Sequence, residues 1–209
     1  MLVPRIVSIT GNTATGTTTL ARNLSKLMGW EPHYSDDYLN VNPYFGNFLH
    51  QPTRWAFHNQ IFLIAEYIES YQYITQSLNT TNRTSCLDYS IFELKVYTKT
   101  MHKMQYVDDA EYNTLVKLLN TYKLVVPDLL IYLTAGIDVI LERVQQRGRA
   151  SESIIDREYI TKLQNDFDDY ASRWDSSPII YIDSEKYNFL NTNVIEKVAK
   201  IIQRKLSRL

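Results

Sequence analysis

Two glycines near the start of the chain, set between an apolar segment and a helical pattern, constrain the fold most. Ile6, Val7 and Ile9 predict a buried strand, and a helix is expected from about residue 17 to residue 28. Between them, Gly11 and Gly16 enclose four residues, which is the glycine spacing of the phosphate-binding motif GxxxxGK[ST]. In such a loop, backbone N–H groups and the helix N-terminus surround an anion. The alternative is an ordinary connection between a strand and a helix.

Position 17 departs from this motif, because Thr17 stands where the motif has lysine. The backbone N–H groups do not depend on that side chain, so phosphate binding is still expected, with weaker affinity. Thr18 keeps the hydroxyl that contacts Mg²⁺ in such loops. The residues predicted to bind the phosphate groups of a nucleotide are Gly11, Asn12, Thr13, Ala14, Thr15, Gly16, Thr17 and Thr18.

The composition of the chain indicates a single domain and argues against partners such as polymeric nucleic acid or a membrane. With 209 residues, 44% of them hydrophobic, the chain can bury the core of one domain. Its 22 basic and 23 acidic residues give a net charge near −1, which indicates no basic surface for polymeric nucleic acid or an anionic membrane. Cys86 is the only cysteine, so no intrachain disulfide can form. We expect a cytoplasmic protein that does not contact a membrane.

Alternating apolar and helical segments predict an α/β fold. Further strands are expected near 31–35, 84–88, 127–133 and 178–182, and a small helix begins at about residue 42. Longer helices are expected near 53–78, 89–104, 108–124, 137–147, 156–174 and 193–208. Five strands that alternate with helices are typical of a parallel sheet with helices on both faces. We interpret residues 1–209 as one domain.

Acidic residues follow two of these strands. Asp36 and Asp37 come after the second strand and Asp88 ends the third, and the carboxyl ends of parallel strands face the ligand site in such folds. Asp36 and Asp37 can equally cap the next helical turn. Three arginines follow the fourth strand: Arg143 and Arg147 share one face of the helix predicted at 137–147, and Arg149 comes after Gly148. A phosphate loop, acids and arginines are the parts that phosphoryl transfer needs.

The order of motifs along the whole chain resembles the deoxynucleoside kinase family, which includes deoxyadenosine, deoxyguanosine and deoxycytidine kinases. The segments that carry the resemblance are Gly11-Asn12, Asn42-Pro43-Tyr44, Pro52 to Gln60, Asp88 to Phe92, Pro127 to Leu133 and Leu141 to Glu152. The resemblance implies the three-layer P-loop kinase fold, with a five-stranded parallel sheet flanked by helices. It also implies a nucleoside as acceptor, ATP or another nucleoside triphosphate as donor, Mg²⁺ as cofactor, and a homodimer.

The resemblance assigns roles to residues around the acceptor. Gln60 corresponds to the glutamine that binds the nucleobase, and Phe57 to a wall of the base pocket. Arg147 and Arg149 correspond to arginines of a lid, about residues 143–155, that closes over the donor phosphates. Glu152 corresponds to an acid of the lid that contacts the sugar 3′-hydroxyl.

The catalytic base of the family precedes the segment Asn-Pro-Tyr. Counting back from Asn42, its place falls on Asp37, and Asp36 is the alternative because the segment after Gly29 is two residues longer here. Asp88 is expected to organise Mg²⁺ together with Thr18.

Three positions depart from the family pattern. Besides Thr17 in place of lysine, Tyr89 replaces an arginine that contacts the transferred phosphate, and Leu49 replaces a tyrosine that contacts the sugar. The loss of one transition-state donor costs roughly 10²- to 10³-fold in rate. Two hypotheses therefore remain open: a deoxynucleoside kinase, and a nucleoside- or nucleotide-binding protein of the same fold that has lost kinase activity.

Overall fold

A computed structural model describes residues 5–121, 126–148 and 155–208. Its centre is a five-stranded sheet in the order β2-β3-β1-β4-β5, in which every neighbouring pair is parallel. The strands are β1 (Ile6–Gly11), β2 (Glu31–His33), β3 (Ser85–Leu87), β4 (Leu129–Thr134) and β5 (Ile179–Asp183). The predicted parallel sheet is confirmed, with all five strands at the expected places in the chain.

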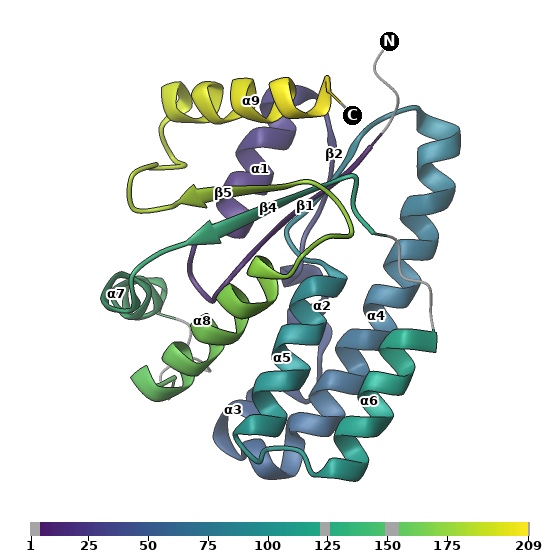
Figure 1. The fold of residues 1–209 in the computed structure, drawn as a ribbon, viewed down its shortest axis with the longest axis vertical. Coiled ribbons are helices and arrows are strands. Elements are labelled where there is room, and N and C mark those ends of the chain that lie inside the picture. The colour runs from purple at the N-terminus through teal and green to yellow at the C-terminus, as the bar shows by residue number, and fades with distance from the viewer. Residues whose placement is uncertain (1–4, 122–125, 149–154, 209) are drawn as a thin grey trace.

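The two faces of the sheet are covered by different helices, as Figure 1 shows. On one face, α1 (Thr17–Met28) packs beside α9 (Thr192–Leu206). On the other face lie α4 (Pro52–Thr81), α5 (Ile91–Lys103), α6 (Asp109–Thr121) and α8 (Arg157–Ser172). Strand residues alternate between the two cores: Val7 and Ile9 pack with α1 and α9, whereas Ile6 packs with α4, α5 and α6. The three-layer architecture is therefore confirmed.

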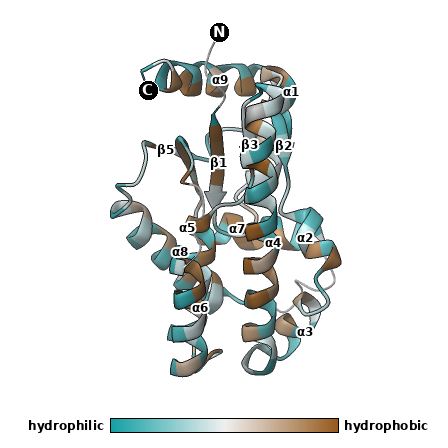
Figure 2. Cartoon of the chain, turned by 90° about the vertical axis from the view of Figure 1, so that its right-hand side faces the viewer, coloured by the Kyte–Doolittle hydropathy of each residue, from teal (hydrophilic) through white to brown (hydrophobic). Residues whose placement is uncertain are grey.

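The central strand explains why this sheet forms. Every residue of β1 is buried, including the polar Ser8 and Thr10, and the shaft of β1 is brown in the hydropathy view of Figure 2, whereas its arrowhead is pale. A parallel strand that is covered on both faces is buried along its whole length. The glycine at its end leads into the phosphate loop, so β1 delivers this loop to the carboxyl edge of the sheet.

Three shorter helices border the site: α2 (Asp36–Val41), α3 (Phe45–His50) and α7 (Ile137–Arg147). The sequence indicated α3 and α7 but not α2, because β2 ends at His33 and the two aspartates begin a helix of six residues. Asp36 and Asp37 thus occupy the first turn of α2, where the helix dipole favours acidic side chains. Within the described residues, no helix combines the length and apolar composition needed to cross a membrane.

Candidate active site

The phosphate loop has the backbone that its glycine spacing predicts. Gly16 has a φ of 99°, in the left-handed region, and directly precedes the first residue of α1. A Cβ atom at Gly11 would lie 2.6 Å from the carbonyl oxygen of Leu133, so only glycine lets the loop pass β4 so closely. No side chain caps the N-terminus of α1, and its first backbone N–H groups can therefore bind an anion.

Neighbouring elements hold this loop in place. The Asn12 side-chain amide donates hydrogen bonds to the carbonyl oxygen of Ile160, at 3.1 Å, and to the Gln164 side chain, at 3.2 Å, both on α8. From α7, Arg143 donates to the carbonyl oxygen of Ala14 at 3.5 Å and to the Ser184 side chain and carbonyl at 2.9 Å. Asn12 and Arg143 are thus anchors that couple the loop to α8 and to the segment after β5.

Two adjoining cavities meet at the loop. The first runs from the loop between α4 and α5, and the second lies between α1, α7 and the segment after β5. The second has a volume of about 580 Å³, which is within the range of small-molecule sites. Ala14, Thr17 and Thr18, all predicted to bind phosphate, border both cavities, as does Arg147. Arg149 and Glu152, together with the rest of residues 149–154 of the predicted lid, lie outside the described residues.

The strand-end acids separate into two groups. Asp36 is half-buried and borders both cavities, whereas Asp37 is exposed and borders neither. Asp88 is buried, and one of its carboxylate oxygens accepts a hydrogen bond from the Ser35 backbone N–H at 2.5 Å. Burial raises the pKa of Asp88, and hydrogen bonds from Thr18 and Ser35 oppose that rise. The structure therefore brings Asp36, Asp88 and Thr18 together and leaves Asp37 outside.

The geometry at Thr18 and Asp88 fits a magnesium ion that is shared with phosphate groups. Among residues 5–121, 126–148 and 155–208, no group of three or more histidine, cysteine, aspartate or glutamate side chains could hold a metal alone. Mg²⁺ in nucleotide sites takes one or two protein oxygens and completes its shell with water and substrate phosphates. The Thr18 hydroxyl and the Asp88 carboxylate meet that requirement.

The first cavity has the predicted glutamine in its lining but not the predicted phenylalanine. Gln60 is fully buried, and its amide nitrogen donates to the carbonyl oxygen of Leu94 at 3.0 Å and to the Thr98 hydroxyl at 2.9 Å. Its amide oxygen has no hydrogen-bond partner among the described residues. Phe57 does not border the cavity. Its ring contacts that of the adjacent His58 on α4 instead, with 6.2 Å between the ring centroids. The aromatic walls are Phe45, Phe48, Tyr67, Tyr97 and Tyr159.

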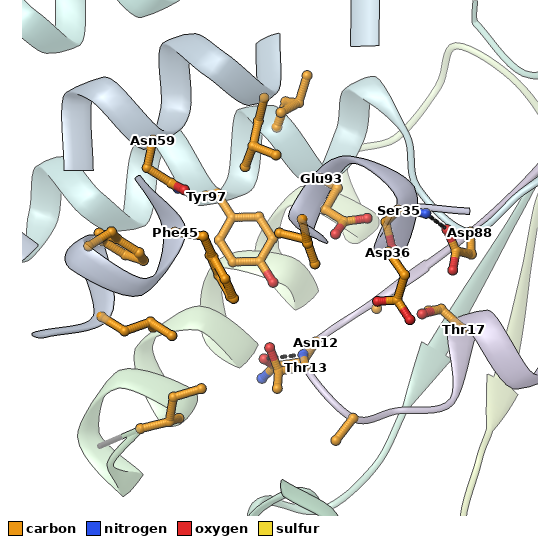
Figure 3. Close-up of a pocket in the computed structure, with 18 of the residues that line it drawn as sticks. Asn12, Thr13, Thr17, Ser35, Asp36, Phe45, Asn59, Asp88, Glu93 and Tyr97 are labelled. Atoms are coloured by element: carbon orange, nitrogen blue, oxygen red, sulfur yellow. Dashed lines mark hydrogen bonds between the residues drawn. The ribbon is translucent and has the colours of Figure 1, made fainter. Parts of the chain in front are cut away.

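Glu93 is a site residue that the sequence analysis missed. It lies in the first turn of α5 and borders the first cavity, where Figure 3 shows it between the aromatic end, with Asn59 and Tyr97, and the end with Asp36 and Asp88. The Thr10 hydroxyl donates to its carboxylate at 3.5 Å. Burial raises the pKa of Glu93 well above its usual range, and the nearby Asp88 raises it further.

A local pattern could have indicated Glu93. The segment Ser90-Ile91-Phe92-Glu93 matches a helix-capping box, in which the glutamate normally turns back to the first backbone N–H. Ser90 does cap α5, since its hydroxyl accepts from the Glu93 N–H at 3.3 Å. The Glu93 carboxyl group turns to Thr10 and the cavity instead. A glutamate whose carboxyl group faces a cavity instead of capping its own helix breaks a local rule, and it is therefore a candidate ligand-binding residue.

The three departures from the family pattern have different environments. Thr17 and Leu49 border the first cavity. Tyr89 does not, because it is fully buried in a cluster of tyrosines, and its hydroxyl lies 2.9 Å from that of Tyr38. The position that carries an arginine in the family is therefore part of the core in this chain.

Comparisons with known proteins agree with this geometry. The sequence model of the family described as "Deoxynucleoside kinase" matches residues 7–207. A deoxyadenosine/deoxycytidine kinase of Bacillus subtilis is 28% identical over 207 residues, covering 94% of this chain and 93% of the relative. A deoxyadenosine kinase of Dictyostelium discoideum is 30% identical over 166 residues, covering 78% of this chain and 65% of the relative.

Solved structures show the same fold. The deoxyadenosine kinase from M. mycoides, solved with the products dCMP and dCDP, superimposes with a TM-score of 0.81 at 23% identity, covering 98% of this chain and 100% of that one. The family match spans nearly the entire sequence, and the phosphate loop, the acids and the glutamine stand together in one site. The chain therefore belongs to the deoxynucleoside kinase family.

Proposed function

We propose that this protein transfers the terminal phosphoryl group of a nucleoside triphosphate to the 5′-hydroxyl of a deoxynucleoside. The observation that carries the proposal is the junction of the two cavities, where the phosphate loop meets Asp36, Asp88 and Thr18. A donor phosphate on the loop would lie beside an acceptor in the first cavity. In-line transfer needs this proximity more than any covalent contribution from the protein.

Each residue at the junction has a distinct part in the proposed reaction. The backbone N–H groups at the start of α1 bind the donor phosphates. Thr18 and Asp88 would hold Mg²⁺, which neutralises charge on the phosphate oxygens when it is bound. Asp36 accepts the proton of the attacking hydroxyl, and Arg147, on the border of both cavities, stabilises the charge of the transferred group.

Gln60 supports a preference among the nucleobases. Both hydrogens of its amide nitrogen are occupied within the protein, so the amide oxygen remains to accept a hydrogen bond from a ligand. Adenine, cytosine and guanine each present an exocyclic amino group that can donate to this oxygen, whereas thymine has none. The two relatives described above are named for deoxyadenosine and deoxycytidine, other relatives from the same two organisms are named for deoxyguanosine, and we propose deoxyadenosine and deoxycytidine as the first acceptors to test.

Transfer of radiolabelled phosphate from ATP to each of the four deoxynucleosides tests the proposal. Asp36→Asn should reduce turnover at least about 10²-fold, the lower range for loss of a general base, while deoxynucleoside binding persists. Asp37→Asn is a matched control, because Asp37 is the exposed neighbour outside both cavities. A loss of turnover in Asp37→Asn alone would move the base to that residue. No turnover with any deoxynucleoside, together with intact binding, would favour the binding protein without kinase activity.

The assembly and compartment of the protein are also proposals. We propose a homodimer formed by α4, α5 and α6, which expose partly buried apolar residues such as Phe57, Ile61 and Leu118. A monomeric mass by sedimentation at micromolar concentration would contradict the dimer. A cytoplasmic location is consistent with the buried free thiol of Cys86, and cell fractionation would test it.

A further inference from the structure

We propose that Arg22 supplies the donor phosphates with the positive charge that a lysine at position 17 supplies in other phosphate-binding loops. The proposal rests on the proposed function only in taking the second cavity as the site of a nucleoside triphosphate. It concerns binding of that ligand, and it can therefore be tested without measuring phosphoryl transfer.

The position of Arg22 on α1 directs its side chain toward the loop. Arg22 lies four residues after Thr18, so the two side chains share one face of the helix. Side chains on a helix lean toward its N-terminus, which at α1 is the end that binds phosphate. Arg22 accordingly borders the second cavity together with Gly16, Thr17 and Thr18.

The guanidinium group of Arg22 is oriented but has unused hydrogen-bond donors. It lies over the ring of Tyr34, 5.4 Å from the ring centroid, and this stacking holds it on the side of the cavity that also contains Asp36. In the part of the chain that the structure describes, Arg22 takes part in no hydrogen bond or ion pair. Its N–H groups are therefore available to a ligand.

Arg143 also borders the second cavity but not the first, and it is not available to bind the donor phosphates. Its guanidinium group already donates hydrogen bonds to the carbonyl oxygens of Ala14 and Ser184 and to the Ser184 hydroxyl. Its contacts stabilise the loop itself. Arg147 belongs to the last turn of α7 and borders both cavities. Arg22 is thus the arginine of α1 that can take the place of a lysine located five residues earlier on the same helix.

Chemistry favours an arginine for this purpose. A guanidinium group presents parallel N–H donors that match two phosphate oxygens, and it keeps its charge at any physiological pH. Arg22 borders the same cavity as the loop residues, so its guanidinium group can approach a phosphate that is bound there. The affinity for adenosine, which has no phosphate group, should not depend on Arg22, whereas the affinity for ATP should.

Calorimetric titration with Mg²⁺ and ATP tests the proposal directly. Arg22→Ala should weaken ATP binding roughly 10- to 100-fold, the range for hydrogen bonds to charged groups, and should leave adenosine and deoxynucleoside binding within about twofold. Lys26→Ala is the matched control, because Lys26 is an exposed cation one turn further along α1 and borders neither cavity. That variant should bind ATP as the natural protein does.

A rescue experiment separates this role from a merely structural one. Thr17→Lys in the Arg22→Ala background should restore ATP affinity to within about threefold of the natural protein, because the lysine would replace the missing charge. ATP affinity unchanged in Arg22→Ala, or a double variant no better than Arg22→Ala, would overturn the proposal. Intact ATP binding without any phosphoryl transfer would contradict the proposed function and leave the role of Arg22 standing. No binding of ATP by the natural protein would overturn both.

Discussion

The hydroxyl of Tyr89 joins three elements of the fold. It lies 2.9 Å from the hydroxyl of Tyr38, on α2, and it also hydrogen-bonds the hydroxyl of Ser70, on α4. Its ring packs at 4.4 Å, centroid to centroid, from that of Tyr67. Tyr89 lies two residues after the end of β3, so this one hydroxyl links the carboxyl edge of the sheet to two helices that border the acceptor cavity.

Tyr89→Phe keeps the ring and removes these bonds. Two buried hydroxyl groups, those of Tyr38 and Ser70, then lose a partner, and the free energy of unfolding should fall by about 2 kcal/mol. For a chain of this size the midpoint of thermal unfolding should fall by about 4–8 °C. Tyr73→Phe is the control, because Tyr73 is 59% exposed and its hydroxyl should contribute little.

Tyr89→Arg restores the residue that the family has at this position, and it should destabilise the fold more than Tyr89→Phe does. Neither Tyr38 nor Ser70 can neutralise a guanidinium group, and an uncompensated buried charge costs about 3–5 kcal/mol. The unfolding midpoint should fall by about 6–20 °C, and turnover should not rise. Differential scanning calorimetry measures both variants. If Tyr89→Arg is as stable as the natural protein and raises turnover, then the arginine reaches the pocket carboxylates and our reading of Tyr89 as a core residue is wrong.

Three further predictions concern the cavity itself. Because burial raises the pKa of Glu93, the folded protein retains a proton that the unfolded chain releases, and the free energy of unfolding should fall as pH rises above about 4.3 toward that raised pKa. Glu93→Gln should reduce this pH dependence in urea unfolding measured from pH 4 to 8. An unchanged pH dependence in the variant would contradict the prediction. Gln60→Leu should reduce calorimetric affinity for deoxyadenosine at least about tenfold while affinity for its analogue without the amino group changes little; equal losses would refute selection by the amide oxygen. Asp88→Asn should raise the Mg²⁺ concentration needed for half-maximal turnover, whereas Glu69→Asn, an exposed site on α4, should not.

Much of the fold follows from short-range patterns. The glycine spacing and the apolar run before it predicted β1, the loop and α1, and the structure places α1 at the predicted residues 17–28. Gly29 ends that helix in the left-handed conformation with a φ of 68°, as a C-terminal glycine is expected to do. These features depend on neighbouring residues alone, and for that reason the sequence predicted them closely.

The residues of the site were harder to predict because their orientation depends on tertiary packing. Asp36 and Asp37 are adjacent, and only the start of α2 decides which of them faces the cavities. Phe57 lies on the correct helix but on a neighbouring face. The capping box formed by Ser90 and Glu93 is visible in the sequence, but the Glu93 carboxyl group contacts Thr10 of β1, and that contact depends on tertiary packing.

The replacements at positions 17 and 89 move positive charge away from the middle of the site. In our proposal Arg22 and Arg147 bind the donor phosphates, and both side chains are exposed, whereas Thr17 is half-buried. Exposed charges are screened by salt much more than enclosed ones, with a screening length of about 8 Å at physiological ionic strength. The affinity for ATP should therefore fall with added salt.

A comparison at constant charge tests this reasoning. The double variant Thr17→Lys, Arg22→Ala exchanges an exposed cation for a more enclosed one and leaves the net charge unchanged. Its ATP affinity should fall less between low and high salt than that of the natural protein, as measured by calorimetry across the two conditions. Equal salt dependence would contradict this reasoning, because it would show that salt screens the cation of Arg22 no more than a cation at position 17.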